Sequence, residues 1–119
     1  MPDKIIKFLV VLLVAVSAGA LADTQKEIVH LLDFVINTSC KYERNGTIYS
    51  GIEAQNHIKI KYRYFIDNIN SAEDFIKYSA TESTISGKKY TILCENMPVQ
   101  NSADWLLEEL KEFRQGQAG

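Results

Sequence analysis

Two cysteines, Cys40 and Cys94, are the only ones in a chain of 119 residues. A bond between their sulfur atoms would close a loop of roughly 55 residues and stabilise the folded state by about 4 kcal/mol in the loop-entropy model. That is close to the whole net stability of a small domain, about 5 kcal/mol. Cysteines pair in oxidising compartments and stay reduced in the cytosol, so the destination of the chain decides whether this bond forms.

The first 22 residues indicate export. Lys4 and Lys7 give a positive start, and Ala20-Leu21-Ala22 supplies small residues suited to a signal peptidase. The uncharged run over 8–22 covers 15 residues, which is short of the roughly 20 that a helix needs to cross a bilayer. We therefore expect a signal peptide over 1–22, cleavage after Ala22 and no membrane span in the mature protein.

The expected mature chain, residues 23–119, has the size of one domain. Removing the two lysines and one aspartate of the first 22 residues from the chain's 13 basic and 15 acidic side chains leaves 11 and 14, a formal charge of −3. An acidic balance argues against a nucleic-acid surface, which is normally basic. In an exported chain the simplest expectation for Cys40 and Cys94 is a structural disulfide, since a redox-active pair usually needs two cysteines close in sequence.

Helical spacing of apolar residues and capping patterns predict four helices. Each of the first three follows an N-terminal capping pattern: Thr24 with Glu27, Ser50 with Glu53, and Ser71 with Asp74. We expect the first helix to begin at Asp23 or Thr24, the second to run from Gly51 to about Asn68, the third to end at about Ser79, and the last to begin at Asn101 or Ser102.

Alternating residues and turn signals predict a short antiparallel sheet. The segment 40–44 alternates toward Asn45-Gly46, a strong two-residue hairpin signal, and a further strand is expected over 88–95. If Cys40 begins one strand and Cys94 ends another, antiparallel pairing brings the two cysteines together. The predicted fold is a small single α+β domain of about four helices packed on a short antiparallel sheet, with one disulfide.

One strip of the second helix is a candidate binding site. Its members fall within roughly 80° on the helical wheel, between the buried face and water, and are Glu53, His57, Lys61, Tyr64 and Asn68. If Arg44 and Asn45 fold over the start of this helix, they complete a small polar cleft in which the Arg44 guanidinium meets Glu53. The alternative is that Glu53 is only a helix cap, His57 and Lys61 only surface neighbours, and Asn45 only a turn residue.

Other chemistries have weaker support. Glu53 and His57 offer two metal ligands, whereas zinc takes at least three from the protein, so we expect no metal and no cofactor. No serine has the partners of a catalytic triad at a recognisable spacing. Acid–base hydrolysis that uses Glu53 or His57 stays open as an alternative.

Trp105 and His30 are two further polar-face side chains of the predicted helices. By helical geometry Trp105 projects away from its helix's apolar face and among acidic residues, which makes it a candidate partner anchor unless the loop near Pro98 covers it. His30 falls on the polar strip of the first helix, where a solvated surface histidine is expected.

An ordered series of short motifs runs from about Tyr42 to Ile92: Arg44-Asn45-Gly46, Glu53-Ala54, His57 to Lys61, Ser71-Ala72 with Phe75-Ile76, Ser83, and Ser86-Gly87-Lys88 with Tyr90. This series resembles the YfeK-like family of small bacterial periplasmic proteins. The resemblance implies a bacterial envelope location, in agreement with the signal peptide, and it brings no established activity. It falls on the residues of the predicted cleft and so favours the cleft as a site.

These observations together favour an exported periplasmic protein that acts as a non-enzymatic binding or inhibitor-like module. Its ligand or partner would meet the cleft around Arg44, Asn45, Glu53, His57 and Lys61, with Trp105 as a further anchor. The partner would be an envelope protein or a small ligand, and the sequence carries no signal for an oligomeric state. The alternative is a small envelope hydrolase.

Overall fold

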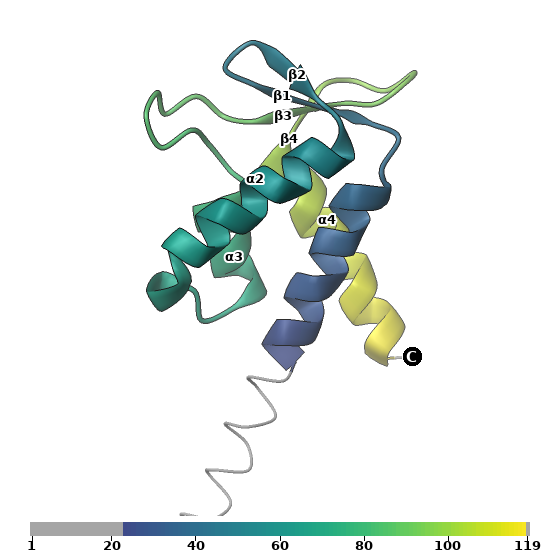
Figure 1. Cartoon of the computed structure of the whole chain (residues 1–119). Helices are drawn as coiled ribbons and strands as arrows, with labels where there is room; N and C mark the ends of the chain where they lie inside the picture. The colour runs from purple at the N-terminus through teal and green to yellow at the C-terminus, as the bar shows by residue number, and fades with distance from the viewer. Residues whose placement is uncertain (1–22, 119) are drawn as a thin grey trace, which may run out of the picture.

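The computed structural model describes residues 23–118, in which helices cover one side of a small antiparallel sheet (Figure 1). The N-terminal helix spans residues 23–37 of the described chain. It is followed by α2 (Gly51–Tyr64), the short 3₁₀ helix η1 (Ile66–Asn68), α3 (Ala72–Ser79) and α4 (Ser102–Ala118). The α+β prediction is confirmed. The expected signal peptide, 1–22, lies outside the described residues.

Four strands form the described sheet in the order β2-β1-β3-β4, and each pairs with its neighbour antiparallel. They are β1 (Lys41–Arg44), β2 (Thr47–Tyr49), β3 (Thr91–Leu93) and β4 (Gln100–Asn101). Asn45 and Gly46 join β1 to β2 with φ angles of 51° and 81°. A two-residue hairpin turn of type I′ needs positive φ at both positions, which the Asn-Gly pair allows, so the predicted hairpin is confirmed.

Side-chain caps set the starts of α2 and α3. Ser50 and Glu53 form the full capping box at α2, and the Ser71 side chain accepts a hydrogen bond from the Asp74 N–H at α3. The end of α2 differs from the prediction, because Phe65 leaves the helical conformation and the chain continues as η1. The helix therefore ends one turn before Asn68.

The core lies between the helices and the inner face of the sheet. The N-terminal helix, α3, α4 and β3 supply its most deeply buried apolar side chains: Ile28, Leu31, Val35, Phe75, Ile76, Ile92, Leu106 and Leu110. Tyr42 of β1 is also buried, its hydroxyl lies 3.0 Å from the Ser102 Oγ, and burial raises its pKa above the ordinary value. The inner face of β1 is thereby fixed against the start of α4.

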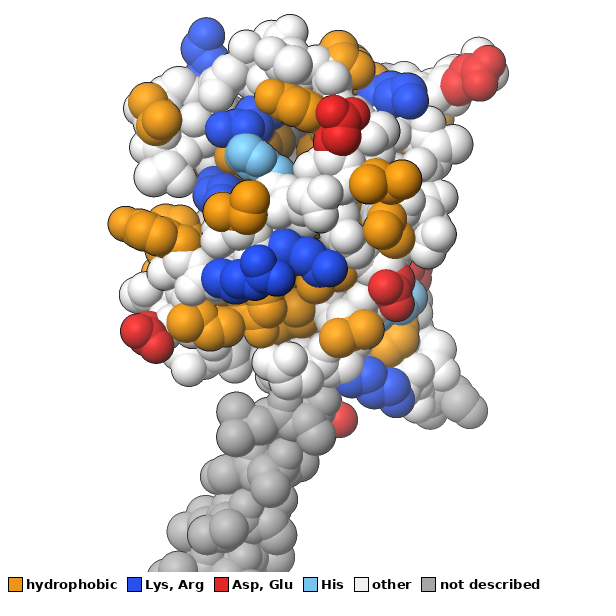
Figure 2. Space-filling view, viewed as in Figure 1, with side chains coloured by type: hydrophobic (Ala, Val, Ile, Leu, Met, Phe, Trp, Pro, Cys, Tyr) orange, Lys and Arg blue, Asp and Glu red, His pale blue; other side chains and the backbone are white. Residues whose placement is uncertain are grey.

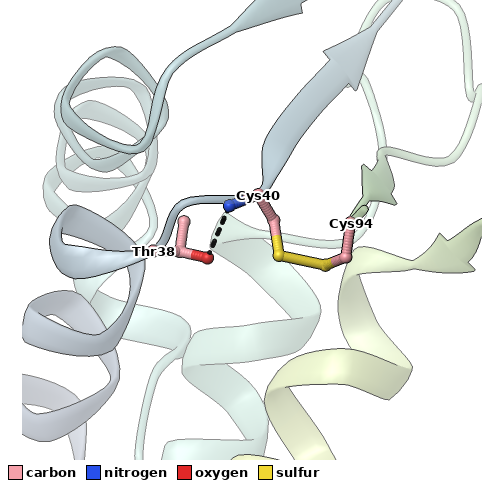
Figure 3. Close-up of a disulfide and its surroundings, with 3 residues drawn as sticks. All are labelled: Thr38, Cys40 and Cys94. Atoms are coloured by element: carbon pink, nitrogen blue, oxygen red, sulfur yellow. Dashed lines mark hydrogen bonds between the residues drawn. A yellow bond between two sulfur atoms is a disulfide. The ribbon is translucent and has the colours of Figure 1, made fainter. Parts of the chain in front are cut away.

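A disulfide joins Cys40 to Cys94 (Figure 3). The two Cα atoms are 4.5 Å apart, at the positions that flank the paired residues Lys41 and Leu93. The Cys40 N–H donates to the Thr38 Oγ1 at 3.1 Å, which holds the short link between the N-terminal helix and β1. The predicted disulfide is confirmed, and it locks β1 and β3 as neighbours.

Trp105 and His30 both lie where helices pack, which differs from the expectations for them. The Trp105 ring packs on Phe34 and Tyr42, with centroid distances of 4.5 Å and 5.9 Å, so its side chain is partly buried against the core. The His30 Nε2 lies 2.7 Å from a Glu109 carboxylate oxygen. A wheel drawn for one helix cannot show a second helix that covers its polar strip.

Candidate functional site

Arg44 and His57 meet at the surface formed by the β1–β2 hairpin and α2. Arg44 is the last residue of β1, and its Nη1 lies 3.4 Å from the His57 Nδ1. A guanidinium is always protonated and only donates, so Nδ1 is the acceptor and the histidine proton belongs on Nε2. On the face that carries α2, a histidine lies among basic side chains (Figure 2). The structure thus brings together Arg44 of the hairpin and His57 of α2, two residues of the predicted cleft.

The expected contact between Arg44 and Glu53 is wrong. The Glu53 carboxylate accepts hydrogen bonds from the Ser50 N–H at 3.0 Å and from the Ser50 hydroxyl at 2.9 Å. These bonds, the backbone one first, hold the pKa of Glu53 below its ordinary value. Glu53 therefore acts as the cap of α2, and the Arg44 guanidinium contacts His57 instead.

A small cavity lies beside this pair. Its volume is about 20 Å³, and we call it the Arg44 cavity; it is lined by Tyr42, Arg44, Tyr49, Ala54, His57, Ile58 and Tyr90. The Tyr49 ring stacks on the His57 imidazole, with centroids 6.4 Å apart and planes 20° apart. Three tyrosines and two aliphatic side chains thus surround one guanidinium and one imidazole.

The electrostatics of the Arg44 cavity are set by positive charge. Burial lowers the pKa of His57 below 6.5, and the charges of Arg44 and Lys61 lower it further. His57 is therefore neutral at neutral pH, and it can accept from Arg44 while its Nε2–H remains a donor. The cavity therefore lies beside a permanent cation and a neutral hydrogen-bonding ring.

Lys61 lies one turn after His57 on α2 and holds the chain that leads into β3. Its Nζ donates to the Glu82 backbone oxygen at 2.7 Å and to the Tyr90 hydroxyl at 3.2 Å. Tyr90 is buried and lines the Arg44 cavity. The sequence predicted Lys61 as a side chain that faces a ligand, whereas the structure gives it the role of fixing Tyr90.

Asn45 holds the same segment from the hairpin side. Its Nδ2 donates to the Ser83 Oγ at 3.3 Å, and its Oδ1 accepts from the Ser86 Oγ at 2.7 Å. The Ser83 N–H in turn donates to the Lys88 oxygen at 2.9 Å. Asn45 is thus more than a turn residue: it fastens the 83–88 loop to the hairpin beside Arg44.

The structure unites Arg44, Asn45, His57 and Lys61, and it adds two aromatic members, Tyr49 and Tyr90, that sequence reasoning did not select. Tyr90 belongs to the motif series and Tyr49 lies between two of its motifs, and this was the signal in the sequence that could have indicated them. Trp105 belongs to a different place, since its ring contacts are with Phe34 and Tyr42.

Sequence reasoning placed Tyr64 on the strip with His57 but missed Ile60, which makes the surface beside His57 apolar. Ile60 is 61% exposed and Tyr64 is 80% exposed. Residues three and four apart on a helix are neighbours, so Ile60 adjoins His57 on one side and Tyr64 on the other. An isoleucine in the middle of the solvent face of α2 was the signal that could have found this surface.

Two properties of the described residues bear on the type of site. Over 23–118, no group of three or more histidine, cysteine, aspartate or glutamate side chains is placed to hold a metal ion. In the same part of the chain, no helix has the length and apolar character of a membrane span.

Fold and site define a small disulfide-bonded α+β domain with an aromatic-lined cavity beside Arg44. The chain belongs to the family of unknown function DUF5329, whose model matches residues 22–114. The matched segment includes the whole Arg44 cavity and both cysteines. Searches of curated proteins and of solved structures find no match.

Proposed function

We propose that this chain is an exported binding module of the bacterial envelope, akin to the YfeK-like proteins that its motif series resembles. Its ligand or partner docks over α2, at the Arg44 cavity and the adjoining Ile60 and Tyr64. The observation that carries the proposal is Arg44, which lines a cavity and whose guanidinium has no carboxylate within salt-bridge distance among residues 23–118. A permanent cation in that position suits recognition of an external group.

The surroundings of the cavity support a docking surface. Ile60 and Tyr64 expose apolar area next to charged and hydrogen-bonding groups. Partner-binding surfaces commonly combine exposed aromatic or aliphatic anchors with arginine. The hydrogen bonds from Lys61 and Asn45 to the 82–90 segment also support a docking surface. They already hold this wall of the cavity in place, so it loses little conformational freedom when a partner binds.

Binding is favoured over the alternative of an acid–base hydrolase. The Glu53 carboxylate accepts hydrogen bonds from the backbone N–H and the hydroxyl of Ser50, so it serves as the cap of α2. His57 has one ring nitrogen engaged by Arg44. A hydrolase would need a second acid or base near His57, and Glu53 is committed to Ser50.

The disulfide supports export, because such bonds form and persist in oxidising compartments. The signal peptide expected over 1–22 would lead there. In the envelope, an acidic small domain without a membrane-spanning helix among its described residues would meet its partner in the periplasm.

A site-specific photo-crosslinker tests this proposal in cells that express the full chain. Placed at position 60, it should give an adduct of defined mass, and His57→Ala should weaken that adduct. The matched control is position 107 on α4, where Leu107 is 40% exposed and contributes to a different surface. Equal adducts at both positions, or none at position 60, would contradict the proposal.

A further inference from the structure

The solvent face of α2 carries exposed apolar side chains among basic ones. Ile52 is 60% exposed, and Ile60 and Tyr64 are more exposed still. Residues three, four and seven apart lie on one side of a helix, so Lys59 and Arg63 stand beside these three side chains. Figure 2 shows Lys and Arg side chains across the middle of this side of the domain, with hydrophobic side chains next to them. We call the set Ile52, Lys59, Ile60, Arg63 and Tyr64 the α2 face.

The positive charge of the α2 face is not neutralised within the described protein. Lys59 and Arg63 have no carboxylate within salt-bridge distance among residues 23–118. The nearest acids in the sequence are Glu53, which caps the helix, and Asp67, which lies in η1. The segment 54–66 between them contains no acidic residue. Two cations on this face are therefore available to an external negative charge.

Charge is distributed unevenly over the domain. The helix α2 carries three basic residues and one acidic one, whereas α4 carries four acidic residues and two basic ones. Figure 1 shows α4 behind α2, so the two helices present opposite charges on different sides of the domain. The field of such a domain turns its α2 side toward a negatively charged surface, even though the net charge of the chain is negative.

The form of the α2 face favours a lipid bilayer over a folded protein as the partner. None of its five side chains lines the Arg44 cavity or the hollows beside the N-terminal helix, α3 and α4. Apolar side chains thus project singly from an outward-curving helix, and a folded partner would need a matching pocket for each of them. The headgroup region of a bilayer takes up such side chains without a fixed complementary shape. Lysine and arginine meet lipid phosphates there, and tyrosine is enriched at this level.

We propose that the α2 face docks on the surface of an anionic phospholipid bilayer. The axis of α2 lies along the bilayer plane, with Ile52, Ile60 and Tyr64 among the headgroups and Lys59 and Arg63 on lipid phosphates. The contact is peripheral, and salt weakens it because ions screen the attraction to phosphate. This inference names the partner of the surface described under the proposed function, and it rests on that function.

The test is co-sedimentation of the exported, disulfide-bonded protein with vesicles of phosphatidylcholine, either alone or mixed equally with phosphatidylglycerol. The protein should partition onto the mixed vesicles at low salt, and much less onto neutral vesicles or at high salt. Lys59→Gln/Arg63→Gln should weaken this partitioning about tenfold or more, since each basic side chain near an anionic surface contributes about fivefold. The matched control, Lys26→Gln/Lys111→Gln, removes the same charge from exposed positions on the N-terminal helix and α4 and should weaken it about twofold or less.

A second pair of variants tests the apolar contribution. Ile60→Ser should weaken binding to mixed vesicles several-fold, because it removes exposed apolar area from the α2 face. Leu107→Ser on α4 is the control and should bind like the wild type. Circular dichroism checks that each variant is folded.

Three results would overturn the bilayer contact: no binding to mixed vesicles, equal binding to neutral and mixed vesicles, and equal losses in the two double variants. The comparison of vesicles uses only the wild-type protein, so it stands even if a variant does not fold. The photo-crosslinker at position 60 separates this inference from the proposed function. An adduct with the mass of a phospholipid supports both, whereas a protein adduct without vesicle binding shows that the bilayer is wrong and the binding function stands.

Discussion

Gly51 lies directly against the backbone of the N-terminal helix, where a Cβ built on its Cα would collide with the Val35 carbonyl oxygen. The same Cβ would come within 3.2 Å of the Thr38 methyl group. Gly51 is the first residue of α2, so this contact sets how closely α2 approaches the preceding helix. Because His57 lies nearly two turns further along α2, the close approach also helps to place that side chain at the hairpin.

We expect Gly51→Ala to lower the free energy of unfolding by about 1–3 kcal/mol, since two backbones must separate to admit the methyl group. Chemical denaturation followed by circular dichroism measures this. Gly116→Ala is the control, because Gly116 lies in α4 and a Cβ added there would meet nothing within 4 Å.

Replacing Gly116 removes a flexible residue from a helix and should leave stability unchanged or raise it by up to about 1 kcal/mol. Equal effects of the two substitutions would show that the contact with Val35 does not matter.

Local signals in the sequence were enough for much of the fold. Ser50 with Glu53 predicted the start of α2, and Asn45-Gly46 predicted the hairpin, because each pattern acts within a few residues. The disulfide was also predictable, since only two cysteines are present and the segments around them alternate like paired strands. By contrast, β4 has only two residues, too few for any alternation to indicate a strand.

The site was less predictable because it depends on which side chains meet across elements. The sequence placed Arg44 near the start of α2, but Glu53 and His57 lie one turn apart on that helix and both could face the hairpin. The capping bonds to Ser50 decide between them, and they leave His57 as the neighbour of Arg44. Trp105 shows the same limit, since its contact with Phe34 requires knowledge of helix packing.

The disulfide yields a second prediction. The bond spans 54 residues of sequence, so its loss should remove about 4 kcal/mol of stability through the entropy of the unfolded chain. For a domain of this size, the thermal midpoint of the Cys40→Ala/Cys94→Ala variant should fall by roughly 15–30 °C. Calorimetry with and without reductant measures the change. Labelling of both thiols in native, non-reduced protein would contradict the bond itself.

A third prediction concerns Arg114 of α4, which joins three helices. Its guanidinium donates to Glu27 of the N-terminal helix at 2.7 Å and to Glu73 of α3 at 2.8 Å. Arg114→Gln should lower the free energy of unfolding by about 1 kcal/mol, and less at high salt, because the arginine is partly exposed. Denaturant titrations at low and high salt measure this. Lys111→Gln, an exposed neighbour on α4, should change stability by less than about 0.5 kcal/mol.

The same network makes stability depend on pH. The hydrogen bond from Arg114 holds the pKa of Glu73 below its ordinary value of 4.5. A carboxylate with a lowered pKa stabilises the fold above 4.5, and this contribution is lost as the pH falls through the pKa of the folded state. Stability profiles from neutral to acidic pH should therefore fall more steeply for the wild type than for Arg114→Gln. Parallel profiles would show that the ion pairs do not form in solution.

The last prediction addresses His57 and its neighbours. Burial, then the charges of Arg44 and Lys61, lower the pKa of His57 below 6.5. Arg44→Gln should therefore raise the pKa of His57, although not fully to 6.5, because burial remains the largest cause. A histidine with a lowered pKa favours the unfolded state as protons are added, so stability should fall as the pH drops from 6.5 through the pKa of the folded state. An NMR titration of the imidazole protons in the wild type, Arg44→Gln and the control Arg63→Gln measures the shift. If the pKa of His57 is the same in all three proteins, the Arg44 guanidinium does not lie beside the imidazole in solution, and the arrangement on which the proposed function depends does not form.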